Sequence, residues 1–168
     1  KRGMNILKKY LKDGYCKTAA EKLLHAERGT VLLTTGFYVA GYAETDGPLG
    51  TVAVAEALNH LGFHSVVVTD KYCKGFFELK QLDVEYVDIA ADEQVYEDIL
   101  DKYHPVYMIS IERCGENAEH EYANMRGVSI TSETAAIDHL FELAPEKHIP
   151  TIGVGDGGNE IGMGNVKD

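Results

Sequence analysis

The sequence predicts an α/β fold with a mainly parallel sheet of about five strands, doubly wound and Rossmann-like. The first observation behind this prediction is that five short apolar segments, rich in Val, Ile and Thr, recur along the chain. The second is that a segment with helical features separates each of them from the next. Such alternation gives right-handed crossovers and parallel neighbours. Strands that are apolar throughout also indicate that helices cover both faces of the sheet.

The elements follow in order from the spacing of apolar residues, glycines and prolines. A helical lead-in is expected over residues 4–28, ahead of a core over 30–168, and the whole chain is expected to be a single domain. The expected strands are TVLLTT (30–35), SVVVTD (65–70), VEYVDI (84–89), PVYMISIE (105–112) and IPTIGVG (149–155). The expected helices between them span 48–62, 71–82, 92–104 and 132–147, with a weak point at Gly75 in the second and an end or kink near Pro145 in the last.

Charge and cysteine content exclude several classes of partner. The formal net charge of -11 argues against nucleic acid and anionic membranes, because their phosphates would be repelled. No apolar run approaches the roughly 20 residues that a membrane helix needs, and the basic start lacks the apolar stretch of a signal peptide. Cys16, Cys73 and Cys114 are unclustered, which is typical of reduced thiols. We therefore expect a cytoplasmic protein.

Three long connections mark the edge of the predicted sheet where a ligand would bind. In parallel α/β sheets, ligands bind beyond the carboxyl ends of the strands. The first, fourth and fifth strands lead at that edge into irregular segments spanning 36–50, 112–127 and 155–164. Most α/β connections have only about 2–6 residues. These three loops therefore predict the functional rim.

Oxygen-bearing side chains on the first and third loops could hold a hard cation such as Mg²⁺ or Mn²⁺. The candidate ligands are Glu44, Asp46, Asp156, Asn159 and Glu160. A structural interpretation stands beside this one. Asp46 would then only favour the dipole of the helix that follows it, and the acidic turn around Asp156 would be satisfied by its own backbone amides.

The second loop carries Glu112, Arg113, Asn124 and Arg126. Arginine presents a planar fork that matches a carboxylate in a bidentate manner, so both arginines could bind an acidic substrate. In a chain this acidic, they could equally be internal partners of other charges.

Glycines in the third loop form a G-x-G-x-x-G pattern at Gly153, Gly155 and Gly158. Asp156 would put an anion where a pyrophosphate must lie, and the helix and the distant acidic residue of a dinucleotide site are missing. A P-loop is excluded because no Gly-Lys-Ser/Thr follows. No nucleotide cofactor is therefore expected.

Four stretches of the chain occur in the same order in one known family. They are "TGFYVAGYAETDGPLGT", "ISIERCG", "YANMRGVSIT" and "PTIGVGDGGNEIGMGNV". Together they resemble the D-glutamate cyclase family over roughly residues 36–166. The family pattern has a Pro and a second Gly-Arg pair after the Glu-Arg, where this chain has Cys114 and Gly115-Glu116. Family members continue past the glycine motif, so we expect a chain truncated at its C-terminus.

The resemblance implies a reversible dehydration of D-glutamate to 5-oxo-D-proline. Either a divalent metal or an arginine could offset the charge of the carboxylate under attack. The catalytic residues that it implies are Asp46, Asp156 and Glu160. The substrate-binding residues that it implies are Arg113, Asn124, Arg126, Gly157 and Gly158. The expected partner is a small amino acid, and a homo-oligomer is one expected state of the protein.

Two alternatives from other classes fit the same rim. A metal-dependent hydrolase or phosphatase would turn over phosphate esters and show no cyclase activity. A non-catalytic amino-acid-binding domain would be stabilised by its ligand and release no product.

Overall fold

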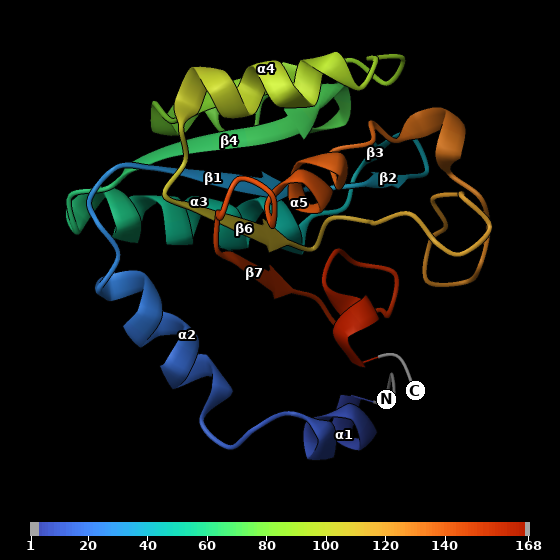
Figure 1. Cartoon of the computed structure of the whole chain (residues 1–168). Helices are drawn as coiled ribbons and strands as arrows, with labels where there is room; N and C mark the ends of the chain where they lie inside the picture. Colours follow the sequence, from blue (N-terminus) through green and yellow to red (C-terminus); the bar gives the residue numbers. More distant parts are fainter. Residues whose placement is uncertain (1–3, 167–168) are drawn as a thin grey trace.

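The central element of the computed structural model, which describes residues 4–166, is a five-stranded sheet (Figure 1). Its strands are β1 (Thr30–Thr35), β4 (His64–Asp70), β5 (Asp83–Val87), β6 (Tyr107–Ile111) and β7 (Thr151–Val154), in the order β5-β4-β1-β6-β7. All four neighbouring pairs are parallel. The predicted parallel α/β fold is therefore confirmed.

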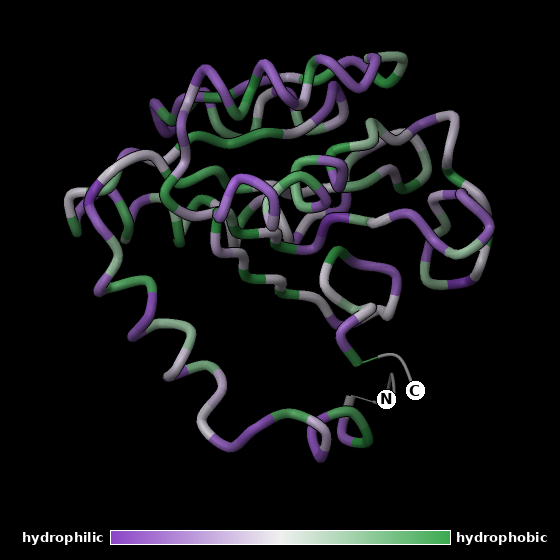
Figure 2. Tube along the Cα trace, in the orientation of Figure 1, coloured by the Kyte–Doolittle hydropathy of each residue, from purple (hydrophilic) through white to green (hydrophobic). Residues whose placement is uncertain are grey.

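The alternation of side chains along the strands divides the core into two layers. Val31 and Leu33 on β1 pack with residues of α3 (Asp46–His60) on one face of the sheet. Leu32 packs on the other face with residues of α4 (Gln94–Tyr103) and α5 (His139–Leu143). Figure 2 shows hydrophobic positions concentrated in the central strands, whereas the outer helix α4 is largely hydrophilic. Helices on both faces explain why the strands are apolar throughout.

The predicted helix over 71–82 is wrong. This segment instead contains two 3₁₀ turns, η2 (Lys71–Cys73) and η3 (Glu78–Lys80). Gly75 lies between them with a φ of 94°, a left-handed conformation that interrupts a helix. Cys73 and Phe77 are nevertheless buried, so the segment still covers the sheet.

The predicted helix over 132–147 is shorter than expected. A 3₁₀ turn, η4 (Thr131–Glu133), comes first, and α5 then spans only His139–Leu143. The carbonyl oxygen of Ala135 accepts a hydrogen bond of 2.6 Å from Nη2 of Arg113. The same carbonyl also accepts from the N–H of Ile137 at 2.8 Å, whereas the N–H of His139, its partner in a helix, donates to Ala136.

The remaining elements lie at the ends of the chain and next to β1. Residues 4–28 form α1 (Met4–Leu7), the 3₁₀ turn η1 (Lys8–Tyr10) and α2 (Tyr15–Leu24). A small antiparallel hairpin, β2 (Tyr38–Val39) and β3 (Tyr42–Ala43), follows β1, and η5 (Met163–Val166) ends the described part. Within residues 4–166, no helix combines the length and apolar character that crossing a membrane requires.

Candidate active site at the carboxyl edge of the sheet

The three predicted loops meet around a cavity of about 530 Å³ beyond the carboxyl ends of β1, β6 and β7. Eight of the residues singled out from the sequence line it: Glu44, Asp46, Asn124, Arg126, Asp156, Gly157, Asn159 and Glu160. Arg113 and Gly158 do not. We refer to this cavity as the acidic cleft, because five carboxylates and one arginine are among its lining residues.

A group of three carboxylates forms one wall of the acidic cleft. Glu112, Asp156 and Glu160 each offer an oxygen atom, and these oxygens lie within 4.8 Å of one another. Glu112 directly follows β6 and has a φ of 50°, which is uncommon for a residue with a side chain. No role was predicted for Glu112. Its position immediately after a central strand was the one available signal.

Backbone amides of its own loop hold the Glu160 carboxylate in place. Its Oε1 accepts hydrogen bonds from the N–H groups of Asp156 (3.2 Å) and Gly157 (2.5 Å), and its Oε2 accepts one from Gly158 (2.7 Å). Glu160 is only 5% exposed. Hydrogen bonds from backbone amides offset the cost of burying a carboxylate.

Two glycines permit this close approach. A Cβ on Gly155 would lie 2.7 Å from the Cβ of Glu160, and a Cβ on Gly157 would lie 2.7 Å from its Oε1. Either contact is too short for a real side chain. The loop can therefore fold around Glu160 only because these two positions are glycine. For Glu160, the interpretation as a carboxylate whose hydrogen bonds come from the backbone amides of its own turn holds.

The first loop uses Glu44 to begin helix α3. Oε1 of Glu44 accepts from the N–H of Asp46, and Oε2 accepts from the N–H of Gly47, each at 2.9 Å. Glu44 thus satisfies two of the N–H groups that a helix start leaves open. Asp46 is exposed on the first turn of α3, and neither acid belongs to the three-carboxylate group. The capping role considered for Asp46 is performed largely by Glu44.

The helix start also lies directly against the carboxylate group. A Cβ on Gly47 would stand 2.8 Å from Oγ1 of Thr35 and 2.9 Å from the Cβ of Glu112. Only glycine allows α3 to approach the ends of β1 and β6 this closely. The positive end of the helix dipole therefore lies beside the acidic cleft.

The expectation that Arg113 binds a substrate carboxylate is wrong for this structure. Its side chain is fully buried, and Nη1 donates to Oδ2 of Asp70 at 2.7 Å and to the carbonyl oxygen of Gly36 at 2.6 Å. Nη2 donates to Ala135, as described above. Arg113 thus ties the carboxyl ends of β1, β4 and β6 to the segment before α5. The alternative of an internal charge partner is the one that the geometry supports.

Asn124 and Arg126, which also line the acidic cleft, lie in one turn. Oδ1 of Asn124 accepts from the N–H groups of Arg126 (2.9 Å) and Val128 (3.1 Å). Arg126 is exposed, and its guanidinium forms no ion pair with any residue in the range 4–166. Asn159 connects the second and third loops, because its Nδ2 donates to the carbonyl oxygen of Ala123 at 2.8 Å.

The electrostatics of the acidic cleft favour a cation. Carboxylates crowded to this degree repel one another unless a positive charge lies among them. Carboxylate and amide oxygens are the ligands that Mg²⁺ and Mn²⁺ prefer. The oxygens of Glu112, Asp156 and Glu160 therefore fit a divalent cation by chemistry and by spacing.

Fold and site together define a doubly wound α/β domain with an acidic cleft at the edge of the sheet where such folds bind ligands. The whole chain, residues 1–168, matches the family model described as D-glutamate cyclase-like, C-terminal. The chain belongs to that family, as the resemblance predicted.

Similarity to individual proteins points the same way. The chain is 34% identical over 174 aligned positions to the human protein named D-glutamate cyclase, mitochondrial. The alignment covers 89% of this chain and 28% of that relative, so the chain spans less than a third of its length. The crystal structure of the Bordetella bronchiseptica enzyme WbmH in complex with NAD+ shares 14% identity with a TM-score of 0.44, covering 73% of this chain and 37% of that one. Similarity at that level bears on neither ligand nor reaction.

Proposed function

We propose that this domain is a lyase that interconverts D-glutamate and 5-oxo-D-proline in the acidic cleft. The observation that carries the proposal is the three-carboxylate group of Glu112, Asp156 and Glu160, in a cleft that Arg126 also lines. Membership of the D-glutamate cyclase-like family supports it. The cleft offers both signs of charge that an α-amino dicarboxylic acid needs.

The chemistry of ring closure can be divided among these residues. The substrate ammonium must lose a proton before its nitrogen can attack the γ-carboxyl carbon. A C–N bond then forms and a C–O bond breaks. The two protons given up by the ammonium leave with the γ-carboxylate oxygen as water. Ring closure thus needs a proton acceptor, a neutralised γ-carboxylate and a folded substrate.

Glu112 is assigned the proton acceptor role. It belongs to the three-carboxylate group, lines the acidic cleft and directly follows the central strand β6. Asp46, exposed on the same rim, is a second carboxylate available for proton transfer. Arg126 is assigned the substrate α-carboxylate, which it would hold through a bidentate contact.

Of the three carboxylates that could hold a divalent cation, Asp156 and Glu160 are assigned to it, with the side-chain oxygen of Asn159, and Glu112 is kept for proton transfer. A cation bound there would offset the negative charge of the γ-carboxylate. Glu160 has its oxygens fixed by the amides of Gly157 and Gly158, so its position does not depend on the cation.

The expected cytoplasmic location stays a prediction, supported by three cysteines that are all free.

Addition of Mg²⁺ or Mn²⁺ is expected to raise the melting temperature, because bound cation stabilises the folded state by mass action. Asp156→Asn should remove most of this rise, since it deletes one charged ligand. Asp92→Asn, at an exposed acid away from the cleft, should keep it in full. Equal melting temperatures with and without both ions would contradict the cation assignment.

Arg126→Ala is expected to lower turnover of D-glutamate about ten- to a hundredfold, because charge-assisted contacts contribute roughly 1.5–3 kcal/mol. The melting temperature without ligand should change little, since this side chain is exposed and forms no ion pair in the range 4–166. Arg126→Lys should recover only part of the loss, because an ammonium lacks the planar fork. Full turnover in both variants would exclude Arg126 as a substrate anchor.

The proposed activity is tested with the purified chain, D-glutamate and an assay for 5-oxoproline, with and without Mn²⁺. Parallel reactions with L-glutamate and p-nitrophenyl phosphate separate the alternatives. Product from D-glutamate alone supports the proposal. Release of p-nitrophenol would favour a metal-dependent phosphatase, and stabilisation by D-glutamate without product would favour a binding domain.

A further inference from the structure

The N-terminal arm, residues 4–28, is attached to the rest of the molecule mainly at its base. No side chain between Asn5 and Arg28 is buried. Leu23 and Ala26 pack partly against the core, and the Arg28 guanidinium lies 4.4 Å from the centre of the Phe63 ring. Figure 1 shows α2 descending from the sheet and α1 lying well away from it.

The exposed part of the arm is both apolar and basic. Ile6 and Tyr10 are 62% and 63% exposed, which is a high value for such large apolar side chains. Lys8, Lys9 and Lys12 lie among them and form no ion pair with any residue that the structure describes. Figure 2 shows hydrophobic and hydrophilic positions alternating along this segment. An amphipathic basic segment of this kind is suited to an apolar surface with acidic edges.

Charge is divided unequally between the arm and the body. Residues 1–28 contain eight Lys or Arg and three Asp or Glu, whereas residues 29–168 contain eight Lys or Arg and 24 Asp or Glu. The two parts thus have opposite net charge within one chain. Complementary charge of this kind steers association and fixes its orientation.

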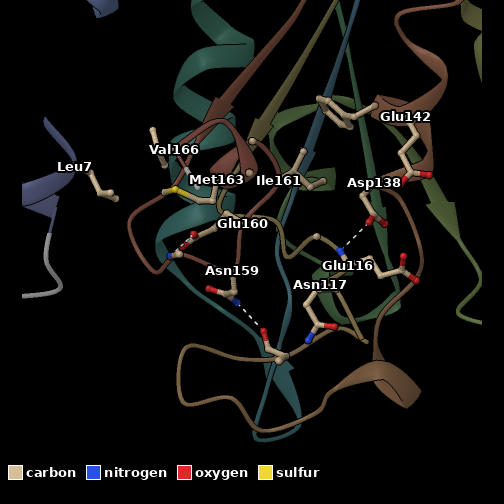
Figure 3. A pocket seen from close by; sticks show the side chains of 17 residues that line it. Leu7, Glu116, Asn117, Asp138, Glu142, Asn159, Glu160, Ile161, Met163 and Val166 are labelled. Atoms are coloured by element: carbon tan, nitrogen blue, oxygen red, sulfur yellow. Dashed lines mark hydrogen bonds between the residues drawn. The ribbon is translucent and has the colours of Figure 1, made fainter. Parts of the chain in front are cut away.

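A second cavity, of about 750 Å³, has the chemistry that the arm would need. Its apolar lining includes Phe141, Ile161, Met163 and Val166. Its charged lining consists of Glu116, Asp138, Glu142 and Glu160, with no Lys or Arg among the described residues that line it. We call it the lateral groove. In Figure 3, Met163, Ile161 and Glu142 lie along it, and Leu7 reaches its margin from a separate segment.

We propose that the lateral groove binds the N-terminal arm of a second copy of this chain, in a reciprocal dimer. Ile6 and Tyr10 of one copy would lie on Met163 and Val166 of the other, with lysines beside Glu116 and Glu142. The arm's own chain brings only Leu7 to the margin of its groove and leaves Ile6 and Tyr10 exposed. A two-fold axis lets the same pair of surfaces be used twice.

The groove lies against the proposed active site, because Asn159 and Glu160 line both cavities. An arm bound there would press on the loop that carries the buried carboxylate. Dimer formation would therefore affect the loop that lines the acidic cleft. The dimer itself does not depend on the proposed reaction.

Photo-crosslinking between copies tests this proposal. Cys16 is the one exposed cysteine among the described residues, so the variant Asn5→Cys/Cys16→Ser places a benzophenone maleimide at the tip of the arm. Ordinary and heavy-nitrogen-labelled chains are mixed, illuminated, digested and analysed by mass spectrometry. Crosslinks of mixed isotope composition between the arm and residues 139–166 are expected. Crosslinks confined to one isotope, or none in this segment, would overturn the proposal.

A charge-reversal pair supplies the matched control. Lys8→Glu/Lys9→Glu should raise the dimer dissociation constant, measured by analytical ultracentrifugation, by about tenfold or more. Lys71→Glu/Lys74→Glu makes the same change in net charge at exposed positions on the body and should raise it far less. Raised salt should weaken the dimer of the unmodified chain. A monomer at all concentrations, or equal effects of the two pairs, would contradict the exchange of arms.

Discussion

Replacing Arg113 by Met is expected to lower the free energy of unfolding by about 3–5 kcal/mol, because removal of one partner leaves a buried charge uncompensated. The charge left without its partner is that of Asp70, whose side chain is 1% exposed and lies 2.7 Å from the guanidinium. The carbonyl oxygen of Gly36 would lose its Arg113 donor in the same step, and that of Ala135 would keep only the N–H of Ile137 of its two donors. For a chain of this length, the melting temperature should fall by roughly 6–20 °C.

The double variant Arg113→Met/Asp70→Leu separates charge from packing. Replacing a whole buried ion pair by apolar side chains is often close to neutral, so the double variant should be more stable than Arg113→Met alone. Thermal unfolding of the single and double variants provides the measurement. If Arg113→Met keeps its melting temperature and loses only turnover, the guanidinium acts on substrate and its structural role is refuted.

Replacing Glu112 by Gln is expected to lower turnover of D-glutamate by about 10²–10⁴-fold, the usual contribution of a positioned general base. The amide cannot accept the ammonium proton, although it keeps the shape of the carboxylate. Both side chains sit on the same left-handed backbone, with a φ of 50°, so the variant should keep its melting temperature. The kinetic loss should appear in kcat, because Arg126 would still bind the substrate.

Glu119→Gln is the matched control for Glu112→Gln. Glu119 is an exposed carboxylate in the same loop and lines neither cavity. It should keep full turnover. Equal losses in the two variants, or full turnover in Glu112→Gln, would remove Glu112 from the proposed mechanism.

Much of the fold could be predicted from local sequence because the strands are short, apolar and bounded by glycine or polar residues. The prediction of a helix over 71–82 was wrong because the spacing of its apolar residues is compatible with a helix, whereas Gly75 adopts a left-handed conformation that this spacing does not reveal. The prediction of a helix in the segment before α5 was wrong for a non-local reason. Its Ala135 carbonyl is bound by Arg113, which lies 22 positions earlier.

The position of the candidate site was predictable because the ends of parallel strands share one edge of the sheet. The division of roles within it was not. Arg113 and Arg126 look alike in sequence, and only the burial of Asp70, 43 positions from Arg113, makes the first of them structural. Glu44 and Asp46 likewise differ only in which carboxylate turns back onto the start of α3. Such distinctions depend on side-chain geometry.

The most direct test of the central claim follows the reverse reaction in heavy-oxygen water. The purified chain is incubated with 5-oxo-D-proline and Mn²⁺, and any D-glutamate formed is analysed by mass spectrometry. Ring opening by water is expected to place one heavy oxygen in the γ-carboxyl group and none in the α-carboxyl group, at a rate that Glu112→Gln lowers by about 10²-fold or more. Absence of labelled D-glutamate, or labelling at the same rate in Glu112→Gln, would contradict a cyclase site built on Glu112, Asp156 and Glu160.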